Sequence, residues 1–292
     1  MRIAIGWDGS DEGLDAMRLG SDLAEQIGAE ITVACAIEPA MLPPELTADR
    51  EEWVKTSHDL YEMARIALGH ANFDFRESVH GPVESLNRLA TETDTDLLVL
   101  GSTHLGPIGR VWPGSVAERV ATHSSCPIVA APAGYARGSA HPGISVLGVA
   151  YDGSRESREA VKVSSELAER LSAEVEVLSV APDYVAADVP LGPLEALRGE
   201  PLRRVDRALA QLPPDVPAVG TVLQGGTAAA LEERGVELDM LVVGTRGRGP
   251  LWSRVLGSVS ADVIRTAPCP VVVVPLGSAR GEVLDDYAAT ER

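Results

Sequence analysis

Short apolar runs and longer amphipathic stretches alternate along the first half of the chain. Runs that predict strands lie at 2–7, 31–37, 72–79, 97–100 and 127–131. Apolar residues at helical spacing predict helices near 16–27, 51–68 and 83–91, with one more helix before the last strand. The segment 97–100 is apolar throughout, which is typical of a strand buried on both faces. This alternation predicts a parallel sheet covered by helices on both faces.

The second half repeats the pattern of the first. Its predicted strands include 175–181, 218–223, 240–243 and 270–274. Short motifs recur at an offset of 143 or 144 residues: Asp8-Gly9-Ser10 as Asp152-Gly153-Ser154, Gly114-Ser115-Val116 as Gly257-Ser258-Val259, and Cys126-Pro127 as Cys269-Pro270. A constant offset over this length predicts two tandem domains of doubly wound α/β type. We place them at 1–135 and 144–278, joined through the stretch from Pro132 to Gly143 and followed by a tail at 279–292.

Composition narrows the class of protein. The 292 residues are 45% hydrophobic and carry a net charge of −18, so we expect no binding to nucleic acid or to an anionic membrane. Only two lysines occur, which excludes a P-loop. Three cysteines without a CxxC motif form neither a disulfide framework nor a zinc site. No apolar run has the length of a membrane span, and the first residues are not typical of a signal peptide, so we expect a cytoplasmic protein.

The candidate chemistry lies where the predicted strands end. Open parallel sheets bind ligands at the carboxyl ends of their strands, where the strand order reverses. Asp8 and Asp152 follow the first strands of the two halves, and Gly101 and Gly244 end the fourth strands. If the first and fourth strands are neighbours, these residues flank one crevice in each half.

A glycine-rich loop in the second half has the features of a phosphate site. It contains Gly244, Gly247, Gly249 and the cations Arg246, Arg248 and Arg254, and it ends at Gly257-Ser258, which opens a helix. Glycines and a helix N-terminus present N–H groups to an anion. The alternative interpretation is that the glycines only make turns and the arginines are solvated. Repetition in both halves and placement at the crevice favour the phosphate site.

The spacing Gly244-x2-Gly247-x9-Gly257-Ser258 resembles the ATP-binding signature of the universal stress protein family, and the resemblance covers nearly the whole chain twice. It implies five-stranded sheets of order 3-2-1-4-5, and ATP, alone or with Mg²⁺, bound without a metal site made by protein side chains. The second-half residues implied at the nucleotide are Asp152, Gly153, Ser154, Val180, Gly244, Arg246, Gly247, Arg248, Gly249, Gly257, Ser258, Val259 and Ser260. Their first-half counterparts are Asp8, Gly9, Ser10, Ala36, Gly101, Gly114, Ser115 and Val116.

The first half departs from this signature at one position. His104 stands where the second glycine belongs. A positive φ there costs a histidine on the order of 1 kcal/mol, and the ring can either occupy the phosphate space or donate to a phosphate. We therefore expect the second half to be the better nucleotide site.

Three functions stay open at this point. The first is an ATP-binding stress-response switch, the second an adenine-nucleotide hydrolase or transferase of the wider superfamily, and the third a nucleotide-free scaffold that dimerises. All six histidines lie in the first half, so the two halves cannot share a histidine base. The last strand, 270–274, is entirely apolar and lies at a sheet edge in the implied order. We expect it to pair with 127–131 of the first half, giving an intramolecular pseudo-dimer, or with another chain, giving a homodimer.

Overall fold

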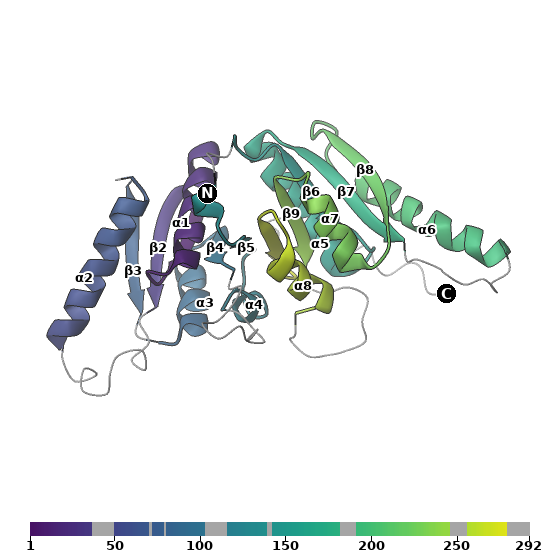
Figure 1. Ribbon diagram of the computed structural model, residues 1–292. Coiled ribbons are helices and arrows are strands. Elements are labelled where there is room, and N and C mark those ends of the chain that lie inside the picture. The colour runs from purple at the N-terminus through teal and green to yellow at the C-terminus, as the bar shows by residue number, and fades with distance from the viewer. Residues whose placement is uncertain are drawn as a thin grey trace.

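The computed structural model describes residues 1–36, 50–69, 72–78, 80–102, 116–138, 142–181, 191–245 and 256–278 (Figure 1). The first half consists of β1 (Arg2–Trp7), α1 (Asp11–Ile27), β2 (Glu30–Ala36), α2 (Arg50–Ala67), β3 (Phe73–Ser78), α3 (Pro82–Glu92), β4 (Leu97–Gly101), α4 (Val116–Ala121) and β5 (Ile128–Ala131). A short 3-10 helix, η2 (Tyr135–Arg137), follows. The second half consists of β6 (Val146–Ala150), α5 (Arg155–Leu171), β7 (Glu174–Ala181), α6 (Leu191–Leu209), β8 (Ala218–Gln224), α7 (Thr227–Gly235), β9 (Met240–Gly244), α8 (Ser258–Thr266) and β10 (Val271–Val274).

All ten of these strands form one continuous sheet. Their order is β3-β2-β1-β4-β5-β10-β9-β6-β7-β8, so each half has the predicted order 3-2-1-4-5. Strands within each half are parallel, whereas β5 and β10 are antiparallel. Figure 1 shows the two halves on either side of this junction.

The junction is the pairing that the apolar last strand predicted. Val272 lies opposite Val129, and Val273 lies opposite Ile128. All four valines of β10 are at most 2% exposed. The two edge strands of the separate halves therefore cover each other within one chain, which is the intramolecular form of the predicted pseudo-dimer.

Helices cover both faces of the sheet, as the pattern predicted. Apolar residues of α1, α2, α5 and α6 form one core with one face, and those of α3, α4, α7 and α8 form a second core with the other face. Met17 and Leu231 are fully buried examples from the two layers. The sheet is buried on both sides, which explains the continuous apolar runs of its central strands. No helix in the described residues is long and apolar enough to cross a membrane.

One ion pair is buried inside the second half. Glu176, in the middle of β7, has a side chain that is 3% exposed, and Arg234 of α7 donates to it from Nη2 at 2.7 Å and from Nε at 3.0 Å. Thr221 of β8 donates its hydroxyl to the same carboxylate at 2.6 Å. Donation to the Glu176 carboxylate raises the pKa of the Arg234 guanidinium above its usual value. These contacts hold α7 against the outer strands β7 and β8.

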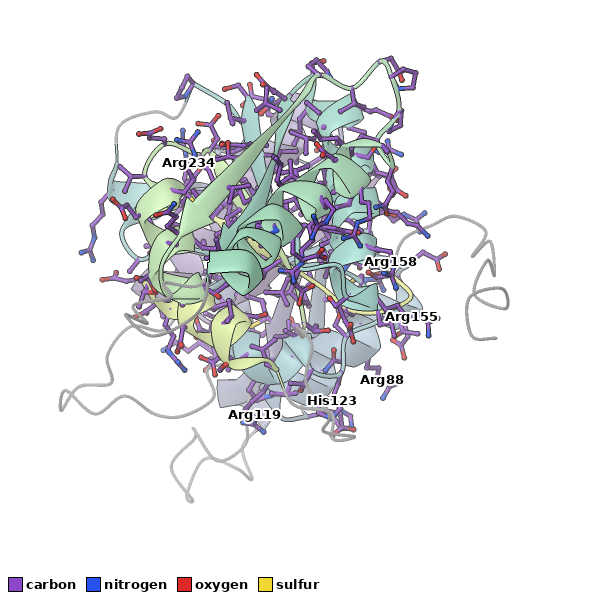
Figure 2. All side chains as sticks on the ribbon, turned by 90° about the vertical axis from the view of Figure 1, so that its right-hand side faces the viewer. Arg88, Arg119, His123, Arg155, Arg158 and Arg234 are labelled. Carbon is purple, nitrogen blue, oxygen red and sulfur yellow. The ribbon has the colours of Figure 1, made fainter. Side chains whose placement is uncertain are left out.

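We expect Glu176→Ala to lower the free energy of unfolding by about 1–3 kcal/mol, because Thr221 and Arg234 lose a buried acceptor while Arg234 keeps its ion pair with Glu237. Chemical denaturation measures this. Arg88 and Glu92 form a matched exposed pair at 2.6 Å, with both side chains more than half exposed, and Glu92→Ala is expected to change stability little. Equal losses from the two variants would contradict a special role for the buried pair. Figure 2 labels Arg88 and Arg234 on opposite parts of the molecule.

Candidate functional site

The strand order brings the predicted site residues to one crevice in each half. β1 pairs with β4, and β6 pairs with β9, so the first and fourth strands are neighbours as the prediction required. Asp8 therefore follows β1 directly beside the end of β4 at Gly101, and Asp152 lies two residues after β6 beside the end of β9 at Gly244. The carboxyl ends of these strands are the positions at which open parallel sheets hold ligands.

The Asp-Gly-Ser motif makes the same tight turn in both halves. Asp152 Oδ1 accepts from Ser154 N at 2.8 Å, and Asp8 Oδ1 accepts from Ser10 N at 3.0 Å. The glycine between them has φ of +80° at Gly153 and +81° at Gly9, a conformation that favours glycine. The serine hydroxyls accept from the third residue of the next helix, at 3.1 Å in α5 and 3.0 Å in α1. Ser10 and Ser154 are thus N-caps, and the turns hold one carboxylate at the mouth of each crevice.

Gly101 and Gly244 are glycines for a packing reason that the sequence did not indicate. A Cβ on Gly101 would lie 2.2 Å from the backbone oxygen of Glu12, and a Cβ on Gly244 would lie 2.8 Å from the backbone carbon of Glu156. The first turn of α1 or α5 therefore rests directly on the end of the fourth strand. This close approach explains both glycines without any ligand.

The N-terminus of α8 faces the same crevice in the second half. Gly257 is its N-cap, with φ −63° and ψ 148° and no capping side chain. The helical hydrogen bond at this end runs from Ala261 N to Gly257 O at 2.9 Å. The backbone N–H groups of Ser258, Val259 and Ser260 therefore precede the helical hydrogen bonds and carry the positive end of the helix dipole.

Two hydrogen bonds tie this helix to the end of β9. Gly257 N donates to Thr245 O at 2.7 Å, and Ser260 Oγ donates to Gly244 O at 2.7 Å. Ser260 is 5% exposed. Its hydroxyl therefore positions the helix against the end of the strand, a role in packing that the family resemblance did not imply.

Val180 lies near the end of β7, in the part of this strand that extends beyond the end of the neighbouring strand β6. Tyr151 N donates to Leu178 O at 2.8 Å, just beyond the end of β6 at Ala150. Backbone groups two residues apart on a strand point to the same side, so the N–H and C=O of Val180 face the space beyond β6. Ala36 ends β2 in the equivalent place of the first half. These backbone groups can pair with the edge of a planar base.

Part of the predicted loop lies outside the described residues. This holds for Arg246, Gly247, Arg248, Gly249, Gly114 and Ser115, and also for His104. Val116 is described as the first residue of α4, where it packs against the second core. Among the predicted second-half residues, those that the structure brings together are Asp152, Gly153, Ser154, Val180, Gly244, Gly257, Ser258, Val259 and Ser260.

Arg158 is a cation at this site that the sequence analysis missed. It lies in the first turn of α5, and its Nη1 donates to Gly153 O at 2.8 Å. The first half has Leu14 at the equivalent place, 38% exposed. Figure 2 shows Arg158 beside Arg155, from the same helix turn. The sequence signal that could have indicated Arg158 was a basic residue shortly after Asp152-Gly153. The first half has no basic residue at the matching position.

The cysteines behave as buried apolar residues. Burial raises the pKa of the Cys35 and Cys269 thiols to about 12, and burial also raises the pKa of Cys126. Thiols in this state are poor nucleophiles at neutral pH. Within the described ranges, no group of three histidine, cysteine or acidic side chains is placed to hold a metal ion.

Comparison with known proteins identifies relatives of both halves. The model of the universal stress protein family matches residues 1–132 and 144–275. A universal stress protein of Mycobacterium tuberculosis is 27% identical over 288 residues, covering 93% of this chain and 96% of the relative. The crystal structure of a universal stress protein from Archaeoglobus fulgidus covers 94% of this chain and 98% of its own, with TM-score 0.67 and 18% identity. A solved family member from Arabidopsis thaliana with AMP bound covers 45% of this chain and 91% of its own, with TM-score 0.36 and 19% identity.

Proposed function

Because this chain belongs to the universal stress protein family, as a tandem of two such domains, we propose that it binds ATP in the second half and acts as a nucleotide-dependent stress-response switch. The observation that carries the proposal is that two sets of backbone hydrogen-bonding groups lie at the ends of the strands on either side of β6. The Val180 backbone faces the space beyond β6, and the N-terminal amides of α8 begin at the neighbouring end of β9.

Each part of the crevice suits one part of a nucleotide. The N–H and C=O of Val180 can pair with the donor and acceptor edge of adenine. The Asp152 carboxylate, held by the turn to Ser154, can accept from ribose hydroxyls. The amides at 258–260 and the cation of Arg158 favour an anion, as phosphates are. In this arrangement Mg²⁺ would be bound by the phosphates of the nucleotide.

The side chains of this crevice suit the binding of ATP better than its rapid hydrolysis. The described residues around it offer carboxylates and backbone amides, and the histidines of the chain are confined to its first half. We expect ATP turnover far below the ~10 per second of a median enzyme. Release of phosphate by the purified chain measures this. Rapid release that is lost in Asp152→Ala would instead assign the chain to the hydrolases or transferases.

The two halves are expected to bind ATP unequally. Position 104 is a histidine in the first half and the matching position 247 is a glycine in the second, and Arg158 has no cationic counterpart in the first half. We expect the second half to bind ATP about tenfold more tightly, a difference of about 1–2 kcal/mol. Calorimetry on the full chain measures this, with Gly114→Asp and Gly257→Asp used to silence one half at a time. Tighter binding when the second half is silenced would invert the ranking and make His104 a ligand.

A further inference from the structure

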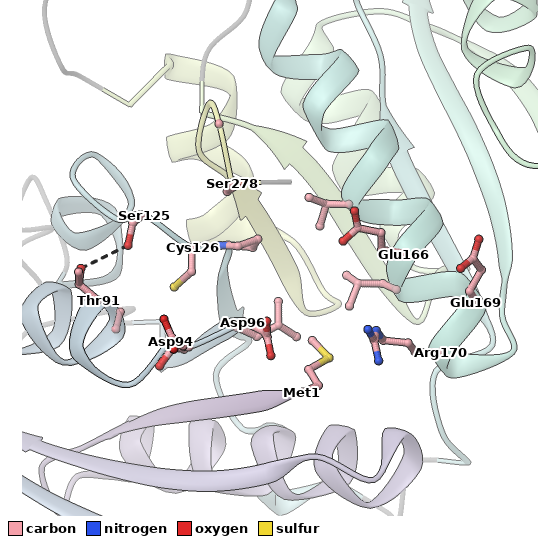
Figure 3. A pocket seen from close by; sticks show the side chains of 17 residues that line it. Met1, Thr91, Asp94, Asp96, Ser125, Cys126, Glu166, Glu169, Arg170 and Ser278 are labelled. Carbon is pink, nitrogen blue, oxygen red and sulfur yellow. Dashed lines mark hydrogen bonds between the residues drawn. The ribbon is translucent and has the colours of Figure 1, made fainter. Parts of the chain in front are cut away.

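A cavity of about 840 Å³ lies between the two halves, away from the nucleotide crevice. It is bounded by the starts of β4 and β5 in the first half and by the C-terminal half of α5 in the second half. Figure 3 shows Met1, Asp96, Glu166 and Arg170 around it, with Ser278 at its rim. The described chain reaches this rim directly after β10.

The sequence repeat relates this cavity to a filled position on the other side of the junction. With the offsets of 143 and 144, Asp96, Glu166 and Arg170 correspond to Asp239, Asp22 and Gln26. Ser278 corresponds to Tyr135. The two places are therefore lined from equivalent positions, with Arg170 in one where the other has Gln26, and one place has an aromatic side chain where the other has a serine.

Tyr135 fills its place almost completely. It is 6% exposed and belongs to the core of the α1 face. Its hydroxyl donates to Asp22 Oδ2 at 3.5 Å, and burial raises its pKa above the usual range of a tyrosine, with Asp22 as the next cause. A buried phenol with a hydrogen-bond partner at its tip is a stable arrangement.

The backbone that carries Tyr135 is fixed by a buried carboxylate. Asp15, 4% exposed, accepts from Gly134 N at 2.8 Å and from Ala136 N at 2.7 Å. Gly134 has φ +81°, and the equivalent Gly277 has φ +84°, so the chain makes the same turn after β5 and after β10. The sequences agree as well: Pro-Ala-Gly-Tyr-Ala-Arg-Gly at 132–138 returns as Pro-Leu-Gly-Ser-Ala-Arg-Gly at 275–281. Only the large side chain is missing from the second copy.

We propose that the C-terminal segment 279–292, which lies outside the described residues, docks into this cavity with Tyr287 in the position that Tyr135 occupies in the other half. Tyr287 is the aromatic residue of that segment. The nine residues that follow Ser278, up to Tyr287, span up to about 30 Å, and the segment leaves the described chain at the cavity itself. Such a short tether supplies an effective concentration on the order of millimolar.

The walls of the cavity suit a phenol. The lining is mixed: it contains the largely covered apolar side chains of Leu97, Val163 and Leu167, each at most 4% exposed, and the carboxylates of Asp94, Asp96, Glu166 and Glu169. Glu166 stands where Asp22 accepts the hydroxyl of Tyr135, and a carboxylate has lone pairs for more than one donor. The site thus offers a carboxylate acceptor at the position equivalent to Asp22.

Four full-length proteins test this: the parent chain, Tyr287→Ala, Ser278→Tyr and the double variant. We expect Tyr287→Ala to lower the thermal midpoint by about 2–4 °C, the shift that a modest loss of packing causes at this size. Hydrogen exchange should become faster at 91–97 and 163–170. Ser278→Tyr places a ring in the cavity from position 278 itself. In a protein that already carries Ser278→Tyr, the further change Tyr287→Ala should therefore alter neither the thermal midpoint nor hydrogen exchange.

Tyr287→Phe is the matched control, because it keeps the ring and removes the hydroxyl, and we expect a smaller loss than with alanine. Removal of 279–292 should reproduce the loss of Tyr287→Ala. The proposal is overturned if Tyr287→Ala changes neither the midpoint nor the exchange, or if it has the same effect with and without Ser278→Tyr.

Discussion

Gly257→Asp is expected to abolish ATP binding by the second half while the protein stays as stable as before. Aspartate is among the best N-cap residues, and the φ of −63° at Gly257 suits it. Its carboxylate would accept from the amides at 258–260 and place a negative charge where a phosphate would bind. We expect the affinity of the second half to fall more than about 100-fold, a loss of about 3 kcal/mol or more. Calorimetry with ATP measures the affinity, and thermal unfolding measures the stability.

Gly226→Asp is the matched control. Gly226 is the N-cap of α7, with φ −68° and no capping side chain, and a Cβ at this position would meet no other atom within 4 Å. The substitution adds the same charge and the same kind of cap in the same half, outside the crevice. ATP binding should be unchanged by it. Equal losses in the two variants would point to an effect of overall charge rather than to the α8 N-terminus.

Val272→Arg is expected to have the largest effect on stability. Val272 is fully buried in β10 at the junction, opposite Val129. A guanidinium there has no counter-charge among its paired strand neighbours and would be removed from water. We expect the free energy of unfolding to fall by more than about 4 kcal/mol, with exposure of β5 and β10 and self-association through them. Denaturation and light scattering measure the two effects.

The comparison for this variant is Val219→Arg. Val219 lies in β8, an outer strand of the same sheet, and is 48% exposed. The same change there should alter stability by less than about 0.5 kcal/mol. If Val272→Arg is tolerated equally well, the continuous ten-stranded sheet is not the form that the protein has in solution.

The parallel strands and the junction could be predicted because they depend on local patterns, whereas the order of the strands was implied by the resemblance to the universal stress protein family. Apolar runs such as 240–243 indicate buried parallel strands, and an entirely apolar edge strand requires a partner. The placement of Asp152 and Gly244 at one crevice depended on that implied order, which makes their strands neighbours, since the ends of neighbouring parallel strands meet at one edge of the sheet. Their contacts with a nucleotide stay predictions.

Features that depend on contacts between distant segments could not be predicted. The reason for a glycine at position 101 is the backbone of Glu12, and the partner of Glu176 is Arg234 on another helix. Neither has a signature in the local sequence. The difference between Tyr135 and Ser278 was visible in the repeat, but its meaning required the antiparallel junction that lines both places from equivalent positions.

Amide hydrogen exchange of the full chain with and without ATP tests the central claim most directly. The account predicts that ATP slows exchange at least about tenfold at two places, the end of β7 around Val180 and the first turn of α8 at 258–260, because the base and the phosphates accept hydrogen bonds there. Exchange in the outer strand β3 should stay the same. Unchanged exchange at both places under saturating ATP, or protection confined to the cavity residues 91–97, would contradict a nucleotide site in this crevice.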